Sequence, residues 1–474
     1  MLDSRSPHRT ALAVFCLLLA PAAGVAQRPA GATAPTALDA KARAEVIDSI
    51  AAYMERSYVS RDTARLIGRA LRTRAGSGAY DAAASPARFA ELVTTDMRSV
   101  NDDLHLSLRF APGDAPNMRR PGPNGVDLEF GGPDGDETPP PPPTPEEVRR
   151  DPFLRNATRQ NYGLTRVEIL PGNVGYLEIS GFMGAPGADV AIGHAMRFLA
   201  GTDAVIIDVR RNGGGSSEMS HMVFSHFLAD SAIPTIRVVN PAAQRSVEQR
   251  SYRRIPGPRR PDVPLYVLTS RRTASAAEEF SFVLKNLGRA VIVGDRTAGA
   301  GHMVAAFNAG HGFIVSVSFT RVTDPRSGKE WERVGVQPEL VVDREVALQA
   351  AHAAALRRVA ERTDDARVKR SVLRIAEGAE ASVRPVAVDA ARLARFAGKY
   401  EGGREVTFRD GALLYYPRVG VLAERLIPLG NDSFALLGDA RVLFTGEGGA
   451  TRLVTETADG TRLSYARLSA RDQP

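Results

Sequence analysis

The chain has 474 residues, a length that allows two to four domains with sizeable cores. Its 61 lysine and arginine residues outnumber its 54 aspartate and glutamate residues, which gives a net charge of +7. Because this excess is modest and no basic tract concentrates it, the composition argues against nucleic acid as a partner.

Residues 1–26 predict a cleaved signal peptide. Arg5 and Arg9 precede an apolar run from Ala11 to Ala20, and small residues follow that run. The run is too short to span a bilayer, and no later run reaches the required length of about 18 residues, so we expect no stable membrane insertion. The only cysteine, Cys16, lies in this segment. A mature chain without cysteine fits a periplasmic or secreted protein, because a stray thiol would be oxidised there.

The next two segments differ in pattern. Residues 37–111 carry helical periodicity, as in Ala44–Met54 and Phe89–Met97, and predict a small N-terminal helical domain. Residues 112–162 contain Gly-Pro and Asp-Gly pairs and the run Pro139–Pro143. This composition predicts a stiff, exposed linker.

The remaining chain predicts two folded units and a connector, so the expected fold class is α+β with several domains. Residues 163–344 alternate strands with helices and predict an α/β core, and residues 345–387 predict a charged, alanine-rich helical connector. Residues 388–469 contain short alternating strands separated by turn signals, which predict a small antiparallel barrel or sandwich. Three aromatic residues could line a binding groove, although aromatics at strand spacing are more often core residues; they are Trp331, Tyr415 and Tyr416.

Two loops of the predicted core have features suited to acyl transfer. The apolar run Leu265–Thr269 breaks into a polar turn that places Ser275 at the start of a probable helix. There, unpaired N–H groups and the positive end of the helix dipole favour developing negative charge. Glycines 213–215 follow the buried-strand pattern Ala204–Ile207 and would let the backbone approach a substrate closely. Each feature also has an ordinary explanation, a helix N-cap in one case and a turn in the other.

With their flanks, these motifs resemble the tail-specific or C-terminal processing protease family, whose relatives include tricorn protease and the interphotoreceptor retinoid-binding protein. The resemblance covers about residues 167–342 and extends through Val174–Ile179, Ile207–Gly215, Thr273–Glu278, Gly288–Gly299 and Trp331–Pro338. It implies a serine peptidase with Ser275 as nucleophile and a stacked ββα core, as in crotonases and Clp-type proteases. No PDZ domain is evident, and residues 388–469 resemble lipocalin-like modules appended to serine-type hydrolases.

A base must remove the proton of the serine hydroxyl. Many members of the family use a lysine, but Ala300 occupies the matching position, and Lys285 lies about 15 Å from Ser275 along the same predicted helix. The tricorn-like branch takes a histidine from a preceding helical domain, and the segment around His105 resembles that branch. The resemblance therefore implies His105 as general base, with His302 as a second candidate.

Three further roles complete the expected site. A carboxylate that fixes the tautomer of the histidine would be Glu332, because relatives place their orienting glutamate before a Glu-x-x-Gly-Val pattern. Asp102 and Asp103 are alternative partners close to His105 in the sequence. The N–H groups of Ala276 and Gly214 are the expected oxyanion donors. Leu104 stands where tricorn protease has a serine, so the sequence does not match the fourth, relay member of that site.

No cofactor or metal is expected. The histidines other than His105 and His302 form no cluster with cysteine, histidine or carboxylates at metal-ligand spacing; they are His194, His221, His226, His311 and His352. The chain has neither a GxxxxGKS phosphate loop nor a GxGxxG motif. The expected function is that of an exported serine endopeptidase, which hydrolyses a peptide or protein substrate through an acyl-enzyme intermediate. The alternatives are a catalytically inactive ligand-binding protein of the retinoid-binding type and an esterase.

Overall fold

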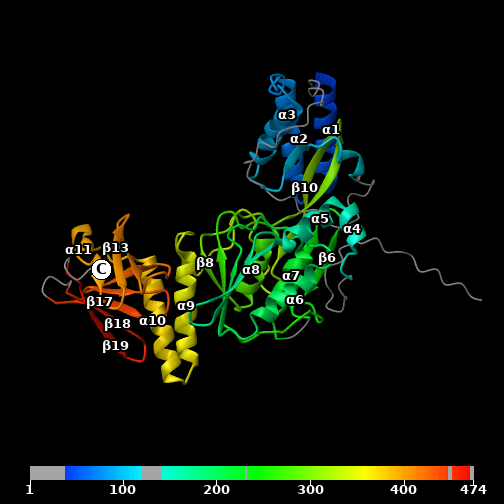
Figure 1. The fold of residues 1–474 in the computed structure, drawn as a ribbon. Helices are drawn as coiled ribbons and strands as arrows, with labels where there is room; N and C mark the ends of the chain where they lie inside the picture. The colour runs from blue at the N-terminus through cyan, green and yellow to red at the C-terminus, as the bar shows by residue number, and fades with distance from the viewer. Residues whose placement is uncertain (1–37, 119–140, 230–231, 447–450, 470–474) are drawn as a thin grey trace, which may run out of the picture.

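A computed structural model describes residues 38–118, 141–229, 232–446 and 451–469 of the chain. The predicted signal peptide and most of the proline- and glycine-rich part of the predicted linker lie outside these residues. Figure 1 shows N-terminal helices, a central α/β part and a C-terminal group of strands. No helix in the described ranges is long and apolar enough to cross a membrane. The fold is a mixed α/β arrangement of several parts, as the sequence predicts.

A six-stranded sheet lies in the central part, with the strand order β11-β8-β7-β4-β3-β2. Its strands are β2 (Leu164–Leu170), β3 (Val174–Ile179), β4 (Ala204–Asp208), β7 (Leu265–Thr269), β8 (Val291–Gly294) and β11 (Leu340–Val341). All neighbouring strands run parallel except β2 and β3, which are antiparallel. Every residue of β4 and β7 is buried, because helices cover both faces of the sheet. This double burial explains the continuous apolar runs in the sequence.

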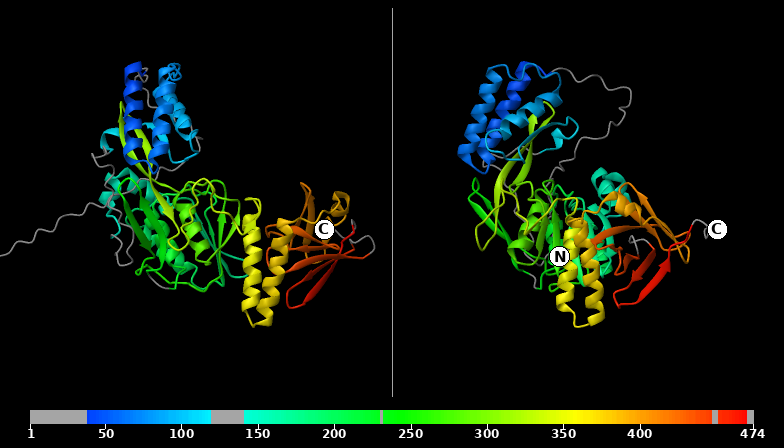
Figure 2. Two further views of the ribbon diagram at one scale, coloured as in Figure 1. Left: turned by 180° about the vertical axis from the view of Figure 1, so that it is seen from behind. Right: turned by 90° about the vertical axis from the view of Figure 1, so that its left-hand side faces the viewer.

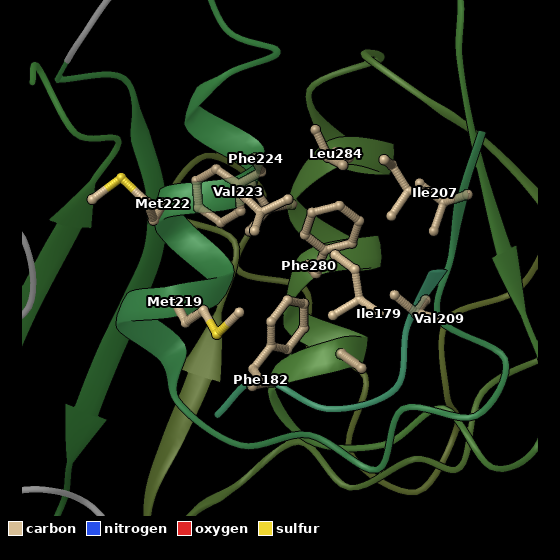
Figure 3. Packing of buried hydrophobic residues seen from close by; sticks show 14 of the residues in the cluster. Ile179, Phe182, Ile207, Val209, Met219, Met222, Val223, Phe224, Phe280 and Leu284 are labelled. Atoms are coloured by element: carbon tan, nitrogen blue, oxygen red, sulfur yellow. The ribbon is translucent and has the colours of Figure 1, made fainter. Parts of the chain in front are cut away.

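Alternate residues of the strands point into two separate hydrophobic clusters. Helices α6 (Ala188–Phe198), α7 (Ser217–Ser225) and α8 (Ala276–Asn286) contribute to the cluster on one face. Figure 3 shows Phe182, Phe224 and Phe280 packed together there.

Two long helices cover the other face of the sheet. They are α9 (Ala347–Arg362) and α10 (Ala366–Val383), whose alanine, leucine and valine side chains pack against Tyr176, Ile206 and Leu268. The sequence predicts this segment as a helical connector. It is helical, but it also completes the core of the sheet, because its apolar stripe is buried against the strands.

The N-terminal helices are α1 (Ala40–Ser57), α2 (Arg61–Gly76) and α3 (Pro86–Arg98). They pack on a second sheet with the strand order β1-β10-β5-β6, in which β9 also pairs with β10. Its strands are β1 (Ser107–Phe110), β5 (Pro234–Asn240), β6 (Arg245–Arg250), β9 (Met303–Gly310) and β10 (Phe313–Thr323). The helices therefore have no separate core, because Phe307, Phe313 and Val315 from the central part share it.

Part of the predicted linker is helical. Two short helices, α4 (Pro145–Arg150) and α5 (Pro152–Arg159), begin with proline after the capping residues Thr144 and Asp151. Two 3-10 turns, η1 (Ala115–Asn117) and η2 (Asn161–Gly163), flank this region. Ala157 of α5 is fully buried in the central cluster, so the end of this segment packs against the core. The sequence analysis missed these helices because each is short and lies next to a proline-rich run.

The C-terminal strands form an eight-stranded antiparallel sheet in sequence order, preceded by helix α11 (Ala390–Ala394). The strands are β12 (Gly398–Tyr400), β13 (Arg404–Arg409), β14 (Ala412–Tyr416), β15 (Glu424–Gly430), β16 (Ser433–Ala435), β17 (Arg441–Thr445), β18 (Arg452–Glu456) and β19 (Arg462–Ala466). Backbone hydrogen bonds join β12 to the chain at the end of β19, including Leu468 N–H to the Lys399 carbonyl at 2.9 Å. The sheet thus closes into a small barrel, which we call the C-terminal barrel. Both views of Figure 2 show α9 and α10 adjoining it.

Candidate active site

Ser275 lies between the end of β7 and the first residue of α8, as the sequence predicts. Its backbone has φ 54° and ψ −124°, a conformation that costs energy for any residue other than glycine. Strained turns between a strand and a helix are typical of nucleophilic serines. The side chain of Ser275 is thereby presented at a helix N-terminus, where the helix dipole favours negative charge.

The glycine loop after β4 lies directly against this turn. A Cβ atom placed on Gly214 would come within 2.7 Å of the Ser275 Cβ, so a side chain does not fit there. The Ala274 N–H donates to the Asn212 carbonyl at 3.2 Å, which ties the two loops together. The Gly214 N–H, one of the expected oxyanion donors, donates to Asn212 Oδ1 at 2.8 Å. It is therefore engaged within the loop, whereas Gly215 lines the cavity beside Ser275.

Glu278 holds the beginning of α8 to the turn that contains Ala300. Its fully buried carboxylate accepts hydrogen bonds from the N–H groups of Gly299 and Ala300, both at 2.7 Å, and from Ser275 N–H at 3.0 Å. The hydroxyl of Thr297 also donates to it. Burial raises the pKa of Glu278 to about 7, even though these donors favour the ionised form. Backbone donors to one carboxylate thus organise the turn that contains Ala300.

A narrow cavity opens at Ser275. Its walls include Ala276, Gly215, His302 and Trp331. The indole N–H of Trp331 is buried and makes no hydrogen bond within the described part of the chain. Trp331 is 2% exposed and packs against Phe282 with the two rings tilted by 44°, so it is a core residue that also forms part of the cavity wall. Tyr415, by contrast, is buried inside the C-terminal barrel, away from this cavity.

A second wall of the cavity carries a buried acid. Glu279, one helical turn after Ser275, is 4% exposed and accepts a hydrogen bond from the Ser217 hydroxyl at 2.7 Å. The fully buried His221 lies 2.9 Å from the same carboxylate oxygen. Nothing in the sequence analysis pointed to these residues.

His105 lies between α3 and β1, in the segment that leads into the second sheet. Arg98 of α3 holds this segment by donating to the carbonyls of Leu104 at 2.6 Å and Leu106 at 2.8 Å. The His105 N–H donates to Asp103 Oδ1 at 3.0 Å. Its ring atom Nδ1 is buried and has no hydrogen-bond partner among the described residues. Burial lowers the pKa of His105 to about 4.

Three segments that are distant in sequence meet at His302. Its Nδ1 lies 3.3 Å from Asp103 Oδ2 and 3.7 Å from Glu332 Oε1. Glu332 Oε2 accepts from the N–H groups of Gly301 at 2.6 Å and His302 at 3.1 Å. Asp103 is fully buried, and its Oδ2 also accepts from the Tyr58 hydroxyl at 2.9 Å. We call Asp103, His302 and Glu332 the acid–histidine cluster.

Charges within the acid–histidine cluster shift one another's pKa. Burial tends to raise the pKa of Asp103, but its hydrogen bond with His302 and the positive charge of that ring outweigh burial and lower it to about 2. Burial lowers the pKa of His302, but Asp103 and Glu332 more than compensate, so the net shift is upward. Burial raises the pKa of Glu332 to about 6, although the charge of His302 opposes the rise.

The structure brings most of the predicted residues to one region. Ser275 and Ala276 line the cavity together with His302, and Glu332 lies against His302. His105 is joined to this region through Asp103. Asp102, by contrast, has an exposed side chain. The cluster was missed because its residues are dispersed along the chain, although the Asp-x-His spacing from Asp103 to His105 was a local signal.

The acid–histidine cluster is also the group in the described residues that could hold a metal ion. One donor atom from each of its three side chains lies within 4.8 Å of the other two. His302 Nδ1 and Asp103 Oδ2, at 3.3 Å, lie within hydrogen-bonding distance of each other.

The central part of the chain is similar to known proteins. Residues 173–342 match peptidase family S41. A carboxyl-terminal-processing protease of Synechocystis sp. is 31% identical over 194 residues, which cover 39% of this chain and 43% of that protein. The carboxy-terminal processing protease CtpB of Bacillus subtilis is 27% identical over 172 residues, or 36% of this chain and 34% of that protein. The chain thus covers less than half the length of these two relatives.

Two proteases are among the solved structures that this chain resembles. The photosystem II D1 C-terminal processing protease is 18% identical, with a TM-score of 0.38, over 64% of this chain and 93% of its own. The tricorn protease is 14% identical, with a TM-score of 0.38, over 68% of this chain and 37% of its own. The resemblance seen in the motifs is confirmed by the match of residues 173–342 to peptidase family S41.

Proposed function

We propose that this chain is an exported serine endopeptidase that acts on peptide or protein substrates through an acyl-enzyme intermediate. The observation that carries the proposal is the conformation of Ser275, strained at the start of α8, pressed against Gly214 and open to a cavity. The similarity of residues 173–342 to C-terminal processing proteases supports the reaction class. Export rests on the predicted signal peptide.

In the proposed reaction, the Ser275 hydroxyl oxygen attacks the scissile carbonyl carbon while His105 takes its proton. The carbonyl oxygen becomes an oxyanion, which the N–H group of Ala276 would stabilise. Gly215 takes the place of the expected Gly214 as the proposed second donor, because Gly215 lines the cavity with Ser275 and the Gly214 N–H donates to Asn212. His105 then returns the proton to the leaving amine as the peptide C–N bond breaks. Water attacks the acyl-enzyme in the same way, which releases the new carboxylate and restores Ser275.

Glu332 is the proposed partner of His105. The Glu332 Oε1 acceptor and the His105 Nδ1 are both buried and have no hydrogen bond within the described residues. Leaving a buried donor and a buried acceptor unpaired costs about 1–3 kcal/mol each, so both groups favour a conformation in which they gain a partner. A hydrogen bond from Nδ1–H to Glu332 would fix the tautomer that leaves Nε2 free to accept the proton.

His302 remains the second candidate for the base, because it lines the same cavity as Ser275 and contacts two carboxylates. The binding-protein alternative has no comparable support, since a carrier does not require a strained serine beside a glycine loop. The esterase alternative shares the acyl-enzyme chemistry and differs only in the leaving group.

Labelling with a fluorophosphonate probe tests the proposal. We expect the probe to modify Ser275 in the native chain and to label Ser275→Ala not at all. Ser217→Ala is the matched control. Ser217 lines the same cavity, and its substitution should leave Ser275 reactive. His105→Ala should slow labelling by roughly 10²- to 10⁴-fold, the usual contribution of a general base.

Two outcomes would contradict the proposal. A native chain that stays unlabelled while folded would favour the binding protein, and undiminished labelling of Ser275→Ala would move the nucleophile elsewhere. A peptide library then separates a peptidase from an esterase, because only a peptidase releases new amino termini from it.

A further inference from the structure

The acid–histidine cluster joins segments that are far apart in the sequence. Asp103 belongs to the segment between α3 and β1, His302 to the turn before β9, and Glu332 to the segment between β10 and β11. Asp103 and His302 are 199 residues apart. Their contact therefore forms only when the N-terminal helices dock on the second sheet.

Each member of this cluster also touches a part of the proposed reaction site. Asp103 Oδ1 holds the backbone of His105, and Asp103 Oδ2 lies against His302. Glu332 Oε2 is held by the N–H groups of Gly301 and His302, while its Oε1 faces His302 at 3.7 Å without a hydrogen bond. His302 thus lies between Asp103, which holds the backbone of His105, and Glu332, which is proposed to orient the ring of His105.

Without His302, two buried carboxylates would lie close together with no positive charge between them. Asp103 is 0% exposed and Glu332 is 9% exposed, so water screens their repulsion poorly. A protonated, neutral carboxyl group cannot stabilise the imidazolium that forms on His105. The positive charge of the His302 ring therefore helps to keep the carboxylates ionised, even if the ring never accepts the proton of Ser275.

We propose that His302 is a positioning residue, which bridges Asp103 and Glu332, keeps Glu332 ionised and aligns His105 only when the N-terminal helices are docked. The proposal rests on the proposed function, because it assumes that Ser275 is acylated with His105 as base. It deepens that function by making the reaction depend on contacts between distant segments.

The charged and titratable groups that face His302 come from both sides of the junction. Asp103, His105 and Tyr58 lie on the N-terminal side, and Glu330 and Glu332 lie on the side of the central part. The net charge of this set favours a protonated His302, since the carboxylates surround it. These carboxylates raise the pKa of His302, which favours a positive charge beside Glu332.

Two substitutions of His302 separate positioning from proton transfer. His302→Asn keeps an N–H donor at the position of Nδ1 but cannot act as a base, and His302→Leu removes both donor and charge. Labelling rates by the fluorophosphonate probe, measured from pH 5 to 9, report on the reactivity of Ser275, and the thermal unfolding midpoint reports on folding. His311→Asn is a control, because His311 pairs with Glu45 at the surface.

Both variants remove the positive charge of His302, and only His302→Asn keeps a hydrogen-bond donor. For a positioning residue, we therefore expect His302→Asn to keep more of the native rate than His302→Leu, which should lose about tenfold or more. One unit of rise in the pKa of Glu332 reduces its ionised fraction about tenfold below that pKa. The acid limb of the rate should accordingly move to higher pH in His302→Leu, and less so in His302→Asn.

Three results would overturn this inference. His302→Asn as inactive as Ser275→Ala would make His302 the base itself. Native rates and an unchanged pH profile in His302→Leu would make the bridge irrelevant to the reaction. If His302→Leu reacts more slowly only in proportion to its unfolded fraction, and the acid limb does not shift, the role of His302 is structural. Failure of the native chain to be labelled would instead refute the proposed function, so the two failures are distinguishable.

Discussion

His105 and His302 lie in one region, yet their surroundings move their pKa values in opposite directions. Burial lowers the pKa of His105 to about 4, whereas Asp103 and Glu332 outweigh burial and raise that of His302. A general base works only when neutral, so the rate falls as the pH drops through its pKa. The pH profile therefore reports which histidine is the base.

We expect the acid limb of kcat/KM to lie below pH 6.5. With His105 as base, the limb reflects the protonation of Glu332, whose pKa burial raises to about 6, and then of His105 near pH 4. In Glu332→Gln the residual activity should show a limb closer to 4, because only His105 then titrates. A limb above 6.5 in the native chain would identify His302 as the base.

The residues that carry chemistry were predictable to different degrees. Ser275 and Glu332 stand in local motifs, and the structure places them in one region. The role of Asp103 was not predictable, because its partners Tyr58 and His302 come from elements far away in the sequence. The N–H of Gly214 was expected to point to a substrate, but in the structure it donates a hydrogen bond to the side chain of Asn212. A sequence motif does not show which acceptor a backbone N–H group will bind.

At the scale of elements, the loop after β4 and the turn before α8 are in close van der Waals contact. Gly214 has φ +110°, and a Cβ there would meet Ser275 Cβ at 2.7 Å and the Ala274 carbonyl oxygen at 3.0 Å. The contact sets the position of the nucleophile relative to the oxyanion donors. Small displacements of reacting groups have large kinetic effects.

Gly214→Ala should therefore reduce labelling of Ser275 by about 100-fold or more, since a displacement near 1 Å can cost that much. Gly201→Ala is the matched control, because a Cβ at Gly201 meets no atom within 4 Å. Circular dichroism and the thermal midpoint would show whether both variants fold. Native labelling in Gly214→Ala would mean that the two loops are not pressed together in solution.

The elements themselves were easier to predict than their pairing. The apolar runs of β4 and β7 and the helical period of α1 and α3 are local signals, and these elements form where the sequence predicts them. The pairing of β1 with β10 joins Ser107 to Ser316, and no local pattern encodes a contact over that distance. For the same reason the N-terminal helices were predicted as a domain with a core of their own, whereas they share one with β9 and β10.

At the scale of the whole molecule, α10 has two different neighbours. Through Val372 and Ile375 it packs on the central sheet, and its other side meets the C-terminal barrel. That second contact includes polar pairs, with Ser371 donating to Asp439 at 2.7 Å and Arg374 paired with Glu456 at 2.7 Å. The barrel also has its own hydrophobic core. The sheet should therefore depend on α10 far more than α10 depends on the barrel.

This asymmetry predicts the outcome of two truncations. A chain ending at Arg384 keeps α9 and α10, so Ser275 should still react with the fluorophosphonate probe at a rate near that of the full chain. A chain ending at Arg344 exposes the apolar face formed by Tyr176, Ile206 and Leu268, and should aggregate or remain unfolded, because burial of such side chains contributes about 1.5–3 kcal/mol each. Cleavage of a protein substrate by the longer fragment could fall without any change in labelling if the barrel helps to position substrates. If the fragment ending at Arg384 is folded by circular dichroism but cannot be labelled, the barrel takes part in forming the active site, and the reaction is not confined to the residues around Ser275.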